Sequence, residues 1–154
     1  MSSSRDLLVK LIEMSSEVYN ILGPGHRESV YHSALEVELR THNIPYDSEK
    51  NVEVLYKGYS VGIKRLDLVI YDNFSIDKNM KIAIELKAMM KKPSIQEYKQ
   101  LHHYLLNLNI EKGLLLNFPQ PNEKTVDYKI DYGIITNETI INKALTDEFI
   151  STTP

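Results

Sequence analysis

Residues 81–88 read Lys-Ile-Ala-Ile-Glu-Leu-Lys-Ala, an alternation of apolar and charged side chains. Because successive side chains of a β-strand point to opposite faces of its sheet, the two isoleucines and the leucine share one face, and Glu85 and Lys87 share the other. The carboxylate and the amine would lie about 6.6 Å apart along the strand. Buried charge is unfavourable unless it is paired or bound to an ion. The stretch therefore predicts a covered strand with a functional site, the alternative being a core salt bridge or an exposed edge face.

Asp67 is a second charged residue in an apolar strand, within Leu66-Asp-Leu-Val-Ile70, although aspartate is a poor strand former. If residues 59–71 and 81–88 form a hairpin, Asp67 lies close to Glu85. Two neighbouring carboxylates repel each other and stay ionised only beside a cation. A divalent metal with oxygen ligands meets that need, and the adjacent lysine meets it only in part. A turn or capping role for Asp67 is the alternative.

The elements around these strands follow from the period of the apolar residues. A 3.6-residue period predicts helices, alternation or a short apolar run predicts strands, and Gly23-Pro24-Gly25 separates the first two helices. A Ser-x-x-Glu capping box at Ser94 and Glu97 begins the third helix. In chain order we expect helices over 6–22 and 26–42, strands over 52–56, 59–71 and 81–88, a helix over 94–109, strands over 112–118 and 128–136, and a short helix over 137–150.

The resulting order α-α-β-β-β-α-β, with a helical crossover between the third and fourth strands, predicts an α/β fold (α+β with a mixed sheet). A central mixed β-sheet would be flanked by helices. The chain has 154 residues, which indicates a single domain over 1–154.

Composition narrows the classes of protein. The chain has no cysteine, which excludes disulfide scaffolds, thiolate zinc sites and cysteine nucleophiles. It has no apolar run long enough to span a membrane and does not begin like a signal peptide. We expect a soluble intracellular protein without a membrane partner, its compartment unspecified.

Charge predicts a local rather than a general contact with nucleic acid. The net charge is −3, so bulk charge would not coat nucleic acid. Between Lys81 and His103, however, five lysines stand against two glutamates. We expect Lys91, Lys92 and Lys99 to contact nucleic acid there, the alternative being an ordinary solvated lysine face.

Two helical patterns point toward the same charged strands. Glu28, Tyr31 and Leu35 are spaced 0, +3 and +7, which places the carboxylate on the core-facing stripe of its helix. A favourable interaction with the helix dipole is the alternative explanation for Glu28. Gln100 and Tyr104 are an i, i+4 pair that could face the same site.

Together these motifs resemble the PD-(D/E)XK nuclease superfamily, and more closely its GxxExxY family. The resemblance covers about residues 7–118 and leaves 119–154 as a C-terminal extension, while the connection 72–80 is longer than is usual in the family. The motifs occur in the family's order: Gly25-His-Arg-Glu28-Ser-Val-Tyr31, Asp67, Glu85-Leu86-Lys87 and Gln100-x-x-x-Tyr104.

The resemblance implies a restriction-endonuclease-like core with one metal site. Asp67 and Glu85 would bind Mg²⁺ or Mn²⁺, helped by the Leu86 carbonyl and by Glu28 directly or through water. The ion would polarise the scissile phosphate and lower the pKa of a bound water.

The remaining roles also come from the resemblance. Lys87 would orient the attacking water or stabilise charge on the phosphate, while Gln100 and Tyr104 would position the phosphate or the lysine. The implied activity is hydrolysis of DNA to 5′-phosphate and 3′-hydroxyl ends, with RNA as a second substrate class. The rival is an inactive nucleic-acid-binding or protein-interaction module on the same fold. A homodimer is left open.

Overall fold

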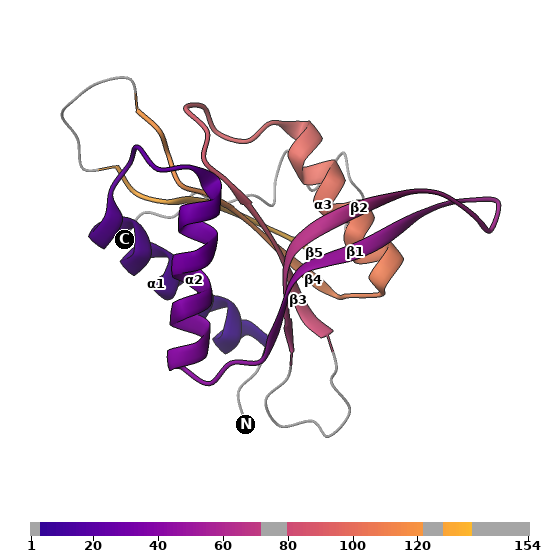
Figure 1. Cartoon of the computed structure of the whole chain (residues 1–154), viewed down its shortest axis with the longest axis horizontal. Helices are drawn as coiled ribbons and strands as arrows, with labels where there is room; N and C mark the ends of the chain where they lie inside the picture. The colour runs from indigo at the N-terminus through magenta and orange to yellow at the C-terminus, as the bar shows by residue number, and fades with distance from the viewer. Residues whose placement is uncertain (1–3, 72–79, 122–127, 137–154) are drawn as a thin grey trace.

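The chain folds around one five-stranded sheet of strand order β1-β2-β3-β4-β5, with helices on both of its faces (Figure 1). The computed structural model describes residues 4–71, 80–121 and 128–136. The expected helix over 137–150 and the polar connection 72–79 lie outside these ranges. The elements are α1 (Ser4–Leu22), α2 (Glu28–Thr41), β1 (Tyr46–Tyr56), β2 (Tyr59–Tyr71), β3 (Met80–Lys87), α3 (Ile95–Leu108), β4 (Lys112–Asn117) and β5 (Asp131–Thr136).

This order confirms the predicted mixed sheet of an α+β fold. The β3–β4 pair is parallel, whereas the β1–β2, β2–β3 and β4–β5 pairs are antiparallel. A parallel pair needs a crossover connection, and α3 supplies it as predicted. No helix in the described ranges combines the length and apolarity that crossing a bilayer requires.

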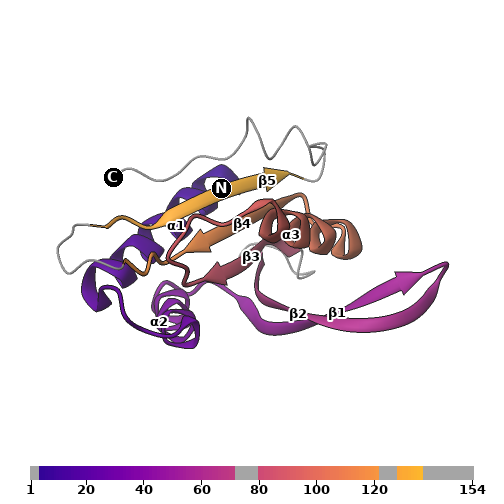
Figure 2. The same ribbon diagram turned by 90° about the horizontal axis from the view of Figure 1, so that it is seen from above.

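The two faces of the sheet carry separate cores. Helices α1 and α2 lie on one face and α3 lies on the other (Figures 1 and 2). In β3, alternate side chains serve the two cores: Ile84 and Leu86 pack with Tyr31 and Leu35 of α2, whereas Ala83 packs with the buried residues of α3. Since Glu85 and Lys87 alternate with Leu86, they point toward the α3 side, as the pattern predicted.

Helix α3 is fixed at both ends and against β4. Ser94 and Glu97 form the predicted capping box, and Asn109 ends the helix in the left-handed conformation with φ 53°. A Cβ on Gly113 of β4 would lie 3.0 Å from the Leu101 side chain. The glycine therefore permits the close approach that holds α3 on the sheet.

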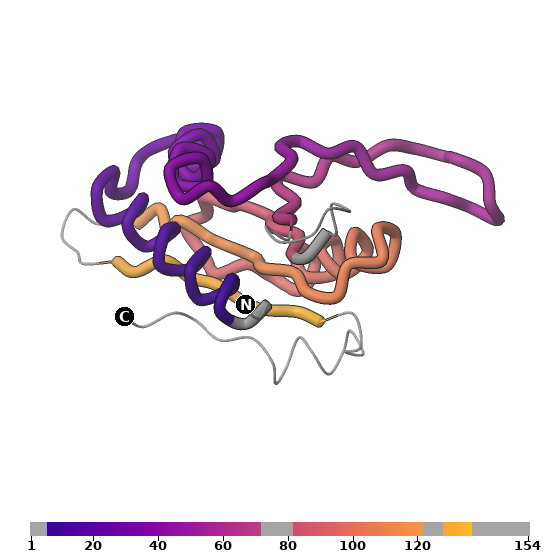
Figure 3. Tube along the Cα trace, turned by 90° about the horizontal axis from the view of Figure 1, so that it is seen from below, coloured from indigo at the N-terminus to yellow at the C-terminus, as the bar shows by residue number. Residues whose placement is uncertain are grey.

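Strand β1 begins at Tyr46, six residues before the apolar alternation that predicted it. Residues 46–51 are mostly polar, yet they pair with β2 from Ile70 back to Arg65. Pairing with the long strand β2 satisfies the backbone N–H and C=O groups of these residues. Their polar side chains show no alternation from which a strand could have been predicted. The hairpin then continues through the predicted Lys57-Gly58 turn, whose φ angles are 50° and 83°, and projects beyond the helices (Figure 3).

Candidate active site

The site lies where β2 parts from β3. The described pairing ends with Leu68 opposite Ile84, so Asp67 and Glu85 are the next residues in register, as the predicted hairpin required. The Asp67 N–H donates a hydrogen bond to Glu85 Oε1 at 3.1 Å, and the Leu86 N–H donates to Asp67 Oδ2 at 2.7 Å. Two carboxylates thus take the place of the backbone ladder at this point.

These carboxylates lack compensating positive charge. Glu85 is 4% exposed, and burial, followed by the nearby Asp67 carboxylate, raises its pKa to about 8. Burial also raises the pKa of half-buried Asp67, and the opposing effects of the Leu86 N–H, His32 and Lys87 do not cancel it. A stable ion pair would lower both pKa values, so the adjacent Lys87 alone does not balance the pair.

Glu28, the first residue of α2, belongs to the same electrostatic neighbourhood. Its side chain is exposed, unlike Tyr31 and Leu35, so the core-facing stripe on which its spacing places it is not fully covered at this first turn. Partial desolvation raises the pKa of Glu28, and the Asp67 carboxylate raises it further, while Lys87 acts in the opposite direction.

The loop that presents Glu28 is held by Tyr31. The Tyr31 hydroxyl donates to the Gly23 carbonyl at 2.8 Å and accepts from Gln120 Nε2 at 3.0 Å, while its ring stacks on Phe118 with centroids 4.4 Å apart. Gln120 Oε1 in turn accepts from the Gly25 N–H at 2.7 Å. Gly25 has φ 102°, a conformation that side chains disfavour. The glycine and the tyrosine therefore fix where α2 begins.

Gln100 and Tyr104 approach the acidic pair from the α3 side. Gln100 Nε2 donates to the Tyr104 hydroxyl at 3.2 Å, and that hydroxyl donates to the Arg65 carbonyl of β2 at 3.2 Å. Burial raises the pKa of Tyr104 to about 12, with Glu85 as the next cause. Both predicted residues of α3 therefore lie close to the carboxylate pair.

A hollow of about 510 Å³ is lined by Lys87 and Gln100, but not by Asp67 or Glu85. Lys99 lines it, whereas Lys91 and Lys92 are exposed in the segment between β3 and α3 and do not. The sequence analysis did not predict four of the lining residues as site residues: Lys64, Gln96, His103 and Glu97, which it named only as a capping residue. Spacing offered a signal for His103, because four lining residues repeat at 0, +3, +4 and +7 along α3. The hollow is lined by Lys64, Lys87, Gln96, Glu97, Lys99, Gln100 and His103.

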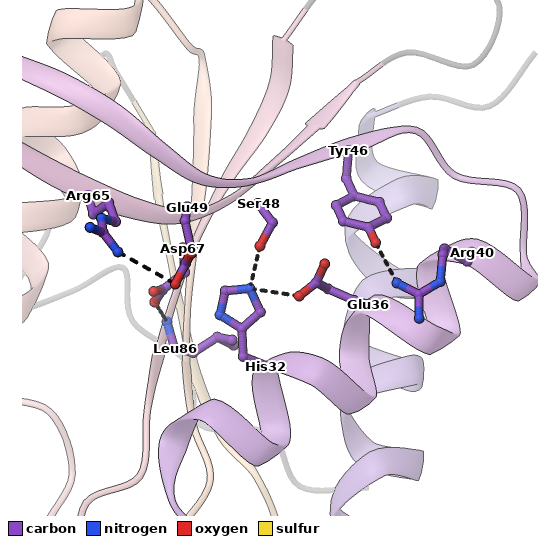
Figure 4. Close-up of polar contacts among 9 residues, drawn as sticks. All are labelled: His32, Glu36, Arg40, Tyr46, Ser48, Glu49, Arg65, Asp67 and Leu86. Carbon is purple, nitrogen blue, oxygen red and sulfur yellow. Dashed lines mark hydrogen bonds and ion pairs between the residues drawn. The ribbon is translucent and has the colours of Figure 1, made fainter.

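His32 is a further residue that the sequence analysis missed. Its Nε2 lies 2.9 Å from Ser48 Oγ and 3.3 Å from the Glu36 carboxylate (Figure 4). It therefore bridges α2 and β1, and its charge acts on both Asp67 and Glu28. The i, i+4 spacing of Glu28, His32 and Glu36 along one helix face was the available signal.

The chemistry of the acidic pair fits a hard divalent cation. Its donors are carboxylate oxygens, which Mg²⁺ and similar ions prefer, and the raised pKa of Glu85 marks a shortage of positive charge. Within the described ranges, no three histidine, aspartate or glutamate side chains converge closely enough to hold a metal ion. Asp67 and Glu85 could supply two ligands, and a third would have to come from a carbonyl, from water or from Glu28.

Comparison with known proteins shows the fold and the family of this chain. The crystal structure of SSO0001 is similar in fold, with a TM-score of 0.50 and 22% identity over 77% of this chain, which spans 54% of that chain. No curated protein matches the chain. The family model of the PD-(D/E)XK nuclease superfamily matches residues 5–129, eleven residues beyond the end of the predicted resemblance. The mixed sheet with its flanking helices is consistent with the restriction-endonuclease-like fold, and the chain belongs to the PD-(D/E)XK nuclease superfamily.

Proposed function

We propose that this protein is a metal-dependent nuclease of the GxxExxY type that hydrolyses DNA phosphodiester bonds. The observation that carries the proposal is the Asp67–Glu85 pair at the parting of β2 and β3. A purely structural pair of charges would be neutralised by its partners. Here burial and mutual repulsion instead raise the pKa of Glu85 to about 8.

Asp67 and Glu85 would hold Mg²⁺ or Mn²⁺ together with the Leu86 carbonyl, and Glu28 would take part directly or through water. When bound, such an ion polarises the phosphate and supplies a water of lowered pKa. The backbone N–H groups of Asp67 and Leu86 each hold one oxygen of a carboxylate, Glu85 Oε1 and Asp67 Oδ2 respectively. Glu28 can adjust because its side chain is exposed.

Lys87 would orient the attacking water or stabilise the charge that grows on the phosphate oxygens. It lines the hollow together with Gln100, so a phosphate in that hollow would meet both side chains. Tyr104 stays neutral at ordinary pH because its pKa is about 12. It would hold Gln100 in place rather than exchange protons.

The expected products are 5′-phosphate and 3′-hydroxyl ends on DNA, with RNA as a second substrate class. Of the lysines expected to contact the nucleic acid backbone, Lys99 is supported by its place in the hollow. Lys91 and Lys92 are exposed but do not line it.

The test is cleavage of plasmid and single-stranded DNA with Mn²⁺ or Mg²⁺ by wild type, Lys87→Ala and a matched control, Lys10→Ala. Lys10 is an exposed lysine of α1. We expect Lys87→Ala to lose at least about 10²–10³-fold in cleavage rate, while its melting temperature and its metal affinity stay near wild type. The control should cleave normally. Equal cleavage by all three proteins would show that Lys87 is not a catalytic residue of this site. No cleavage by wild type with either ion would favour the inactive binding module.

A further inference from the structure

The outer part of the β1–β2 hairpin, residues 54–65, is named here the arm. It reaches past α3 and away from the rest of the fold (Figures 2 and 3). Large apolar side chains along the arm are exposed to solvent rather than packed. A group of such side chains on the surface of a soluble protein is typical of a binding site. Their exposed fractions are Leu55 53%, Tyr56 61%, Tyr59 75%, Val61 63% and Ile63 67%.

Two aromatic rings stand at the tip of the arm. Tyr56 and Tyr59 are paired across the Lys57-Gly58 turn, so their positions are fixed by the hairpin. Lys57 Nζ lies 5.5 Å from the centre of the Tyr56 ring. Flat rings beside a cation can stack with nucleobases and attract the phosphate that follows each base.

The positive charge of the arm indicates which class of molecule it would bind. Residues 54–65 contain three cations and no carboxylate, and the nearest carboxylate along β1 is that of Glu53, which pairs with Ile63. The net charge of the whole chain is −3. One of these cations, Arg65, lies 3.8 Å from Glu49. Another, Lys64, lines the hollow that also contains Lys87. The arm therefore carries Lys57 beside the rings at its tip and Lys64 at the hollow, with the uncharged residues 59–63 between them, and these two cations complement a polyanion.

We propose that the arm binds single-stranded nucleic acid by stacking unpaired bases on Tyr56 and Tyr59. A duplex keeps its base faces stacked internally, whereas a single strand can offer them to aromatic side chains. The strand would run from the tip past Lys64 into the hollow. This inference rests on the proposed nuclease function for the hollow, and it gives that function a preference for substrates with unpaired bases.

The test compares binding of a labelled oligothymidylate and of a blunt duplex, by fluorescence anisotropy in EDTA, so that no cleavage occurs. The variant Tyr56→Ile/Tyr59→Ile keeps apolar bulk and strand propensity but removes both rings. We expect it to bind the single strand about tenfold more weakly, the loss of roughly one stacked base, with duplex binding changed less than about twofold. Tyr56→Phe/Tyr59→Phe retains the rings and should bind like wild type.

A direct readout is available because the chain has no tryptophan. In Tyr59→Trp the single indole reports on the tip, and its emission should be quenched saturably by the oligothymidylate. Unquenched emission, or undiminished single-strand binding by the isoleucine variant, overturns the inference while leaving the nuclease proposal to the cleavage assay. Failure of wild type to bind the single strand likewise overturns the inference, and cleavage with Mn²⁺ or Mg²⁺ remains the separate test of the nuclease proposal. A dimer of wild type in light scattering that Tyr56→Ser/Tyr59→Ser dissociates, without loss of single-strand binding, would assign the arm to a second copy and also overturn it.

Discussion

The two ends of β2 lie in different environments. From Leu66 to Tyr71 the strand is buried between β1 and β3 and contributes to both cores, whereas from Tyr59 to Arg65 it is exposed throughout. Asp67 lies just inside the boundary, where β2 has left β3 but is still covered by helices. The comparison shows why a carboxylate pair can exist here. The inner half supplies rigidity and desolvation, and the outer half leaves room for a ligand to enter.

The largest expected effect comes from the same substitution made in each half. Ile70 is completely buried and Ile63 is 67% exposed. We expect Ile70→Ala to lower the free energy of unfolding by about 2–5 kcal/mol because it leaves a cavity. Ile63→Ala should change it by less than about 0.5 kcal/mol. Urea denaturation of both variants measures the difference, and similar losses would mean that the outer half is buried in solution.

Much of the inner half was predictable from the sequence. Alternation in residues 81–88 places Glu85 and Lys87 on one face, and the hairpin then brings Asp67 into register. Both inferences depend only on the two-residue period of a strand and on the cost of buried charge. The capping box of Ser94 and Glu97 was also predictable, because it depends only on two residue types three positions apart.

The rest depends on how distant segments meet. Lys64 of β2 lines the hollow together with residues of α3. No spacing of residues along β2 predicts that it meets this helix. His32 meets Ser48 across α2 and β1. Glu28 matches the apolar stripe by spacing, yet it is exposed because a first-turn side chain lies beyond the sheet's cover. The period of the apolar residues predicts which face of an element a residue occupies. It does not predict how far along the element that face is covered by other parts of the fold.

A smaller effect is expected from metal binding at the boundary. Mn²⁺ at a hundred times its Kd should stabilise wild type by about 2.7 kcal/mol. Asp67→Asn removes one of two repelling charges and one ligand. Its metal-free form should therefore melt at or above the wild-type temperature, and most of the Mn²⁺-induced rise should vanish.

Differential scanning calorimetry of both proteins, with EDTA or with millimolar Mn²⁺, provides the measurement. A structural salt bridge to Lys87 gives the opposite pattern. Asp67→Asn would then melt several degrees lower than wild type, and neither protein would respond to the ion. That result would show that Asp67 and Glu85 do not form a metal site.

The pH dependence of the metal-free protein sharpens the same comparison. Glu85 has a pKa of about 8 in the folded protein against an ordinary value near 4.3 when unfolded. Between these values the folded state holds the proton and the unfolded state has released it, so the free energy of unfolding falls as pH rises from about 5 to 8.

Subtracting the profile of Glu85→Gln isolates this group from the histidines that titrate in the same range. We expect the wild type to lose at least about 1.4 kcal/mol more than the variant across the window, which corresponds to one pKa unit. Urea unfolding in EDTA at a series of pH values gives both profiles. Parallel profiles would show that Glu85 is ionised normally and that the boundary is not desolvated.

The smallest expected effect is on the binding of a single strand along the path from the outer half of β2 to the hollow. Lys64 is an exposed residue of the outer half that lines the hollow, whereas Lys91 is an exposed lysine that does not. A lysine that neutralises one phosphate of a single strand contributes about 0.7 to the slope of log binding constant against log salt concentration. Lys64→Ala should therefore reduce that slope by roughly this amount and weaken binding several-fold at low salt, while Lys91→Ala should change it less. Titrations of an oligothymidylate at several salt concentrations decide between them. If the slope falls for Lys91→Ala alone, the strand reaches the carboxylate pair along the segment between β3 and α3, and the outer half of β2 is not its path.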